Sequence, residues 1–158
     1  MQEKETFNKT DFTDVFHAPE KGRIVALDIG TKRIGVAVCD EMQFTTRAVC
    51  VLKRASWKKL LKQIITILED FDAKALVLGL PYTFGGAESE MSQEARRLAR
   101  NFSLSLQIPV FLQDERVSSI DAKNMLYEQG HSFEEILKKI DAEAAAIILS
   151  DFLTRKNR

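Results

Sequence analysis

The chain has 158 residues, and its 23 lysines and arginines balance 23 aspartates and glutamates. This length suits one domain with a sizeable core, but the zero net charge lacks the positive excess of many nucleic-acid binders. No apolar run approaches the ~20 residues needed to cross a bilayer, and the polar amino terminus lacks the apolar core of a signal peptide, so we expect a cytoplasmic protein without membrane contact.

The first elements are predicted to be strands. Residues 1–21 are polar and are expected to form a flexible amino-terminal extension, while residues 22–158 form the domain. The apolar runs at 23–28, 34–40 and 46–52 predict three strands, and their short connections predict an antiparallel meander. The two cysteines, Cys39 and Cys50, are too few for a disulfide scaffold. They could pair between neighbouring strands, but free buried thiols are the preferred prediction.

Helices alternate with strands in the rest of the chain. Ser56 is a candidate N-cap for an amphipathic helix at 57–71. Further along, the pattern predicts strands at 75–81 and 109–115, a glycine-rich loop at 82–89, helices through 94–102 and 118–130, a short helical stretch at 133–139 and a separate final helix at 141–153. The two later strands follow helical crossovers and should therefore run parallel to the first strand.

Three acidic positions end predicted strands. Asp28 closes the first strand, and Asp114 and Glu115 close the fifth. Parallel strands bring their carboxyl ends to one edge of a sheet, where open α/β folds place ligands. The alternative is that these acids only form turns.

A further acid lies near the carboxyl terminus. At 100° per residue, Asp141 shares the apolar face of its helix with Ala145, Ile148 and Phe152, whereas Glu143 points the opposite way. A charge on an apolar face needs a partner. Asp141 could bind a cation there, or it could simply cap the final helix.

Clustered carboxylates favour a divalent cation. Like charges close together repel, and Mg²⁺ or Mn²⁺ is the oxygen-preferring ion that compensates them. Two such ions can activate water and stabilise the leaving oxygen in phosphodiester cleavage. The two histidines, His17 and His131, are far apart in sequence and do not suggest a zinc site.

Four segments together resemble one known family. The segments GRIVALDIGTKRIGVAVCD, LVLGLPYTFGG, VFLQDERVSSIDA and DAEAAAIILSDFL, in this order, look like the blocks of the YqgF family, described as Holliday junction resolvases or pre-16S rRNA nucleases. The likeness runs from about Gly22 to Leu153. YTF stands where family members often carry LNMDG, and Cys39 stands where serine is usual.

The resemblance implies a fold, an activity and a site. The fold would be ribonuclease H-like and related to the RuvC resolvases: a mixed five-stranded sheet, made of a three-stranded antiparallel meander and two parallel strands, flanked by helices. The activity would be a Mg²⁺- or Mn²⁺-dependent endonuclease that processes the 5′ end of pre-16S rRNA, or alternatively resolves branched DNA. Carried over by position, the catalytic acids are Asp28, Glu115 and Asp141, with Asp114 as a further metal-ligand candidate.

Basic and polar residues near these acids are candidates for substrate binding. Thr31, Lys32 and Arg33 could hold phosphate, or they could form an ordinary solvated hairpin turn. Arg116 could bind the scissile phosphate or orient a carboxylate. Two basic helix faces could also contact nucleic acid, although such faces are usually solvated surface: Lys58, Lys59 and Lys62 on one helix, and Arg96, Arg97 and Arg100 on another.

Two other functions compete with a nuclease. The glycine-bearing hairpin also resembles the phosphate-binding hairpin of actin-like kinases, but those proteins close two such domains around a nucleotide. A non-catalytic nucleic-acid-binding protein is the second alternative, but it would gain nothing from unpaired carboxylates beside phosphates. The sequence allows either a monomer or a homodimer, and a junction with two symmetric strands would favour a dimer.

Overall fold

A computed structural model describes residues 15–81, 88–115, 130 and 133–157, with the backbone alone for Phe16 and for 133–141. It contains five strands: β1 (Ile24–Ile29), β2 (Arg33–Cys39), β3 (Thr46–Lys53), β4 (Ala75–Pro81) and β5 (Val110–Glu115). The helices in this part of the chain are a short 3₁₀ turn, η1 (Val15–His17), and three α-helices, α1 (Trp57–Asp70), α2 (Glu90–Ser105) and α4 (Phe133–Lys156).

The sheet has the predicted mixed topology. Its strand order is β3-β2-β1-β4-β5. The pairs β1–β2 and β2–β3 are antiparallel, whereas β1–β4 and β4–β5 are parallel. The three short-connected strands therefore form the meander, and the two strands after helical crossovers run parallel to β1, as expected.

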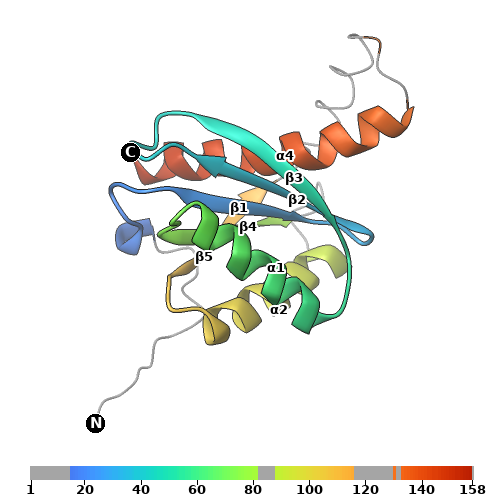
Figure 1. Ribbon diagram of the computed structural model, residues 1–158, viewed down its shortest axis with the longest axis horizontal. Helices are drawn as coiled ribbons and strands as arrows, with labels where there is room; N and C mark the ends of the chain where they lie inside the picture. The colour runs from blue at the N-terminus through green and yellow to red at the C-terminus, as the bar shows by residue number, and fades with distance from the viewer. Residues whose placement is uncertain (1–14, 82–87, 116–129, 131–132, 158) are drawn as a thin grey trace.

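Helices cover both faces of the sheet. Figure 1 shows α1 and α2 on one side and the long α4 crossing the other. Alternate residues of the strands supply the two apolar layers, because successive side chains point to opposite faces. In β1, for example, Val25 and Leu27 belong to the core under α1 and α2, and Ile24 and Ala26 belong to the core under α4.

The helix caps follow local sequence. The Ser56 hydroxyl accepts a hydrogen bond from the Lys59 amide, which confirms the predicted N-cap of α1. The helix expected through 94–102 begins earlier, at Glu90, because Ser89 and Ser92 form a reciprocal capping box. The predicted helix at 118–130 lies outside the described residues, apart from Gly130, whose φ of 81° suits glycine.

The prediction of two separate helices at 133–139 and 141–153 is wrong. The structure has one continuous helix, α4, and Asp141 lies two turns inside it. No glycine or proline interrupts this stretch, so nothing in the local sequence stops the helix. Asp141 is therefore not a helix N-cap.

Part of the predicted extension packs against the domain. Within η1 and the residues after it, Val15 and Ala18 contact the core under α4. The buried Gln43 side chain donates hydrogen bonds to the carbonyls of Pro19 and Gly22. These contacts hold residues 15–22 beside the sheet.

Both cysteines are free, as predicted, but Cys50 is only partly buried. Cys39 is buried, and its sulfur accepts a hydrogen bond from the Ile24 amide. Burial raises the pKa of both thiols, Cys39 and Cys50.

Gly79 permits the close approach of α4 to β4. A Cβ at this position would collide with the Cδ1 atom of Ile148. We expect Gly79→Ala to cost about 1–3 kcal/mol of unfolding free energy in urea denaturation, through overpacking. Ile148→Val removes the colliding atom, so the double variant should be more stable than the two single effects predict. Strict additivity would contradict this explanation.

Candidate functional site

Asp28 lies at the carboxyl end of the sheet, on the face covered by α4. It follows Ile24 and Ala26 on the same side of β1. On the neighbouring strand β2, Gly35 is the residue directly opposite Asp28. On the other side Leu27 pairs with Leu78, so the next residue of β4, Gly79, lies beside Asp28. Asp28 is therefore flanked on both sides by residues without side chains.

Strand alternation separates the two acids at the end of β5. Phe111 faces α4, so Gln113 and Glu115 share that face. Asp114 shares the opposite side with Leu112, which belongs to the core under α1 and α2, and is exposed. Glu115, and not Asp114, therefore lies on the same face of the sheet as Asp28.

The Glu115 carboxyl has a strongly raised pKa. Burial raises the pKa of its carboxyl to about 8, and the hydrogen bond that the protonated carboxyl donates to Asp151, together with the negative charges of Asp151 and Asp28, adds to the increase. A hydrogen bond from the Gln113 side chain acts in the opposite direction. The carboxylates of Asp28, Glu115 and Asp151 therefore influence one another, as expected of acids gathered at one edge.

Asp151 is an acid near Glu115 that the sequence pattern does not single out. It lies on α4 with an exposed side chain, three residues after the buried Ile148. No sequence signal distinguishes it from an ordinary solvated acid; only the crossing of α4 over β5 brings it to Glu115. Asp141 precedes Asp151 by ten residues, or about 15 Å along a continuous helix. The Asp141 side chain lies outside the described part of the structure.

Buried oxygen atoms near Glu115 suit a hard cation. Glu115 Oε1 and Gln113 Oε1 are both buried and have no hydrogen-bond partner within the described residues. An acceptor without a donor is costly in a protein interior, and a cation such as Mg²⁺ satisfies carboxylate and amide oxygens equally well. Among the described residues alone, no three histidine, cysteine or acidic side chains form a complete metal site. The donor set nevertheless fits Mg²⁺ or Mn²⁺.

The turn between β1 and β2 is held in place by Arg54. Gly30 closes the turn by donating its amide to the Arg33 carbonyl over 2.9 Å, and a Cβ on Gly30 would lie 2.7 Å from that oxygen. The Arg54 guanidinium donates to the Gly30 carbonyl over 3.0 Å, and its backbone amide donates to the Lys32 carbonyl. Thr31 and Lys32 are exposed at this turn. The predicted phosphate-binding turn therefore has a fixed backbone and accessible side chains.

Arg54 in turn is anchored to α2. Its guanidinium forms an ion pair with Glu94 at 2.5 Å, and Glu94 also pairs with Arg97 at 2.8 Å. Hydrogen bonds from Arg97 and Arg54 lower the pKa of Glu94 to about 2. We call Arg54 and Glu94 the brace, because they connect the β1–β2 turn to α2.

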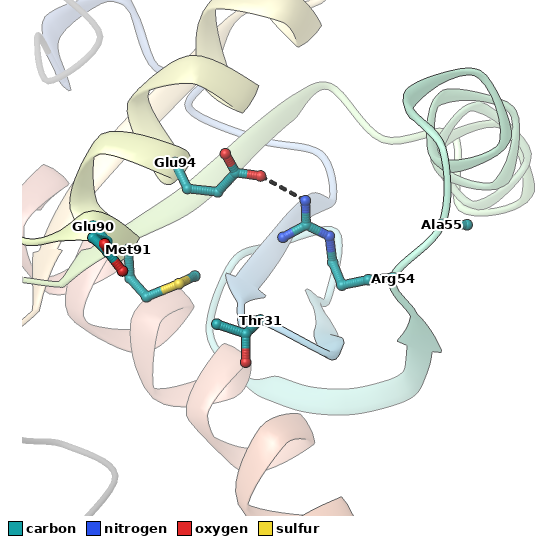
Figure 2. Close-up of a pocket in the computed structure, with 6 residues that line it drawn as sticks. All are labelled: Thr31, Arg54, Ala55, Glu90, Met91 and Glu94. Atoms are coloured by element: carbon teal, nitrogen blue, oxygen red, sulfur yellow. Dashed lines mark hydrogen bonds and ion pairs between the residues drawn. The ribbon is translucent and has the colours of Figure 1, made fainter.

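A pocket opens beside the brace. It is an open depression with a volume of about 460 Å³, lined by Thr31, Arg54, Ala55, Glu90, Met91 and Glu94. Figure 2 shows the ion pair of the brace on one side and the Met91 side chain extending toward Thr31 and Arg54. The pocket lies on the side of α2, whereas Asp28 faces α4, but both occur where β1 ends.

The other candidate basic residues differ in their surroundings. Arg96 pairs with Glu88 at 3.2 Å and Arg97 pairs with Glu94, so two arginines of the α2 face are already neutralised. The lysine face of α1 is exposed. Arg116 lies outside the described residues.

No helix in the described part of the chain has the length and apolar character needed to span a membrane.

Comparison with known proteins identifies the family. A model of the RuvX family, described as Holliday junction resolvase, matches residues 22–155. A relative from Anaeromyxobacter sp. (strain K) is 38% identical over 85% of this chain and 98% of its own length, and one from Roseiflexus sp. (strain RS-1) is 34% identical over 85% and 95%. Both are named as pre-16S rRNA nucleases.

A solved structure has the same fold. Thermus thermophilus RuvC, in complex with a Holliday junction substrate, superposes with a TM-score of 0.50 over 85% of this chain and 95% of its own, at 14% identity. This likeness supports the ribonuclease H-like architecture predicted from the four sequence blocks. The extent of the family match and the identity to these relatives show that the chain belongs to the RuvX family, also known as YqgF.

Proposed function

We propose that the protein is a divalent-metal-dependent endonuclease that cleaves phosphodiester bonds in structured nucleic acid, with pre-16S rRNA as its substrate. The observation that carries the proposal is the position of Asp28 and Glu115 on one face of the sheet, with a buried carboxylate oxygen that lacks a donor. The relatives named as pre-16S rRNA nucleases support the choice of RNA. Resolution of branched DNA is the second candidate, because the family description names that activity.

Three acids are proposed to hold the cation: Asp28, Glu115 and Asp141. Asp114 is omitted because it faces away from Asp28 on β5. When bound, Mg²⁺ or Mn²⁺ supplies a Lewis acid that polarises a phosphoryl oxygen and makes bound water more acidic. Glu115 interacts with Asp151, which lies about 15 Å from Asp141 along α4. For Glu115 and Asp141 to hold the same cation, the Glu115 side chain must therefore move away from Asp151.

The remaining residues are proposed to position the substrate. Thr31 and Lys32 project from the fixed turn next to Asp28, where a hydroxyl and an ammonium can bind phosphate oxygens. Arg33 and Arg116 are further proposed phosphate contacts, on the basis of the sequence. The balanced net charge makes such local contacts necessary, because the chain as a whole does not attract nucleic acid.

The direct test is a comparison of substrates. Purified protein with Mg²⁺ or Mn²⁺ is incubated with precursor rRNA, a four-way DNA junction and a plain duplex, each with and without excess chelator. We expect cleavage of the precursor rRNA that stops in chelator. Preferential cleavage of the junction would favour the second candidate, and full activity in chelator would rule out a metal-dependent nuclease. Sedimentation of the active protein decides between a monomer and a homodimer.

Asp141→Ala is expected to lose cleavage activity with little change in thermal stability. Asp141 lies inside α4 and is not its N-cap, so the ~0.5–2 kcal/mol cost of removing a cap should not appear. A nuclease assay and a thermal melt on the same preparation separate the two effects. Glu143→Ala is the control, because Glu143 is exposed on the same helix and should change neither quantity. Retained activity in Asp141→Ala would remove this residue from the proposed metal site.

The turn predicts a specific salt dependence of binding. Each neutralised phosphate contributes about −0.7 to −0.9 to the slope of log affinity against log salt. We expect replacement of Lys32 and Arg33 by alanine to flatten this slope by about one to two units, measured with Ca²⁺ in place of Mg²⁺. The matched control replaces Lys58 and Lys59, which are exposed on α1. If the control flattened the slope and the turn variant did not, phosphate binding would belong to α1.

A further inference from the structure

The pocket beside the brace has a lining of mixed chemistry. Met91 and Ala55 provide apolar surface, Thr31 provides a hydroxyl, and Glu90 provides a carboxylate. Arg54 provides a planar guanidinium whose Nε atom is buried and has no hydrogen-bond partner within the described residues. The pocket therefore combines an apolar wall, a planar guanidinium and a carboxylate acceptor.

The guanidinium of Arg54 is fixed from two sides. It donates to the Gly30 carbonyl over 3.0 Å and to the Glu94 carboxylate. Its side chain and that of Glu94 are each only 22% exposed. A guanidinium held in this way already has a fixed orientation before a ligand binds. Binding a flat group against it therefore costs little side-chain entropy.

The charges of the lining decide which part of a nucleotide fits. Arg54 is already neutralised by Glu94, and Glu90 adds a negative charge at the pocket. A phosphate would meet this negative charge and would gain nothing from Met91 and Ala55. A nucleobase has a flat apolar face that suits Met91 and Ala55 and, in three of the four bases, amino groups that can donate to Glu90. Bases also stack readily on arginine guanidinium planes.

From these contacts we infer that the pocket lined by Thr31, Arg54, Ala55, Glu90 and Met91 binds one unpaired nucleobase of the substrate strand. The inference rests on the proposed nuclease function and specifies how that function selects its substrate. The volume of about 460 Å³ lies within the ~300–1,000 Å³ of small-ligand sites, which is room for one base with its sugar. A base in a duplex is stacked and paired, so only an unpaired base can enter.

This pocket gives the protein a preference for strands with an unpaired nucleotide. The turn that ends β1 carries Asp28 before it and Thr31 within it, so the pocket and the acids lie at the same edge of the sheet. A strand whose phosphate is held at the acids can therefore place a neighbouring base beside the brace. A fully paired strand can use only the phosphate contacts.

Methionine methyl NMR provides a test with an internal control. The full-length protein is labelled at its methionine methyl groups. It is titrated separately with adenosine, with inorganic phosphate, with a short single strand and with a duplex of the same sequence. Ca²⁺ is added to the two nucleic-acid titrations to prevent cleavage. Adenosine and the single strand should shift the Met91 resonance, whereas phosphate and the duplex should not. Met42, which is 51% exposed and lies outside the pocket, should not move.

A pocket-filling variant completes the test. Ala55→Phe should abolish the Met91 shift and lower affinity for the single strand by about tenfold, while affinity for the duplex is retained. Leu104→Phe, at an exposed position of α2, is the matched control and should behave as wild type. Thermal melts establish that both variants are folded.

The outcomes separate this inference from the proposed nuclease function. An equal Met91 shift with inorganic phosphate would show an anion site and would overturn the nucleobase assignment. Binding and metal-dependent cleavage of nucleic acid without any Met91 shift would overturn the inference and leave the nuclease intact. If the protein bound no nucleic acid in any form, the proposed function itself would fail.

Discussion

The Asp28→Asn variant is expected to lose nucleic-acid cleavage by more than about 100-fold, the upper range for residues that only support a metal ligand. Asparagine keeps the shape of the side chain and removes its negative charge, so the loss would report on charge at the cation site. Folding should be preserved. Asp28 contributes to the unfavourable charge around Glu115, so its neutralisation relieves repulsion at this edge of the sheet.

The measurement combines cleavage rates in Mg²⁺ with a thermal melt of each variant. Asp114→Asn is the matched control, because Asp114 is exposed on the opposite face of β5. It should retain activity close to that of wild type. A folded Asp28→Asn protein with full activity would remove the metal-nuclease proposal, and an inactive Asp114→Asn protein would show that Asp114 has a role that strand alternation does not explain.

Glu115→Gln should make the metal-free protein more stable at high pH. The pKa of Glu115 is raised to about 8 in the folded state, above the ordinary value of 4.5. Between these values the folded protein holds a proton that the unfolded chain has released, so the unfolding free energy falls as the pH rises. The penalty is absent near pH 4.5 and is complete above pH 8. Glutamine has no charge to desolvate and therefore avoids it.

The size of this effect is limited by solvent. Glu115 is only partly buried, so solvent screens its charge and reduces the energetic effect of the pKa shift. We therefore expect Glu115→Gln to raise the unfolding free energy by about 1–2 kcal/mol at high pH. For a domain of this size, that difference corresponds to a melting temperature about 2–8 °C higher than wild type at pH 9. The two proteins should melt together at pH 5.

Melting curves in chelator from pH 5 to pH 9 test this expectation. Glu143→Gln, with an exposed side chain, should follow the wild-type curve. Added Mn²⁺ should then raise the melting temperature of wild type at pH 8 and have a smaller effect on Glu115→Gln, because binding to the folded state stabilises it. Identical pH profiles for wild type and Glu115→Gln would show that the pKa of Glu115 is not raised in the folded protein.

The sequence alone predicted the sheet because its signals are local. Apolar runs and short connections specified the meander of β1, β2 and β3, and helical crossovers specified parallel β4 and β5. The same logic brought Asp28 and the end of β5 to one edge. The helix boundaries were less predictable: the capping box at Ser89 begins α2 earlier than its apolar pattern, and the acid at Asp141 resembled a cap although α4 continues through it.

Contacts between distant segments were decided only by the tertiary structure. The sequence left Asp114 and Glu115 as alternatives, and the alternation of β5 against the α4 layer placed only Glu115 on the face of Asp28. Asp151 reaches Glu115 only because α4 crosses the sheet to β5. The brace of Arg54 and Glu94 joins residues 40 positions apart. Periodicity and motif spacing report the neighbours of a residue along the chain, whereas these pairings depend on the packing of whole elements, which no local pattern records.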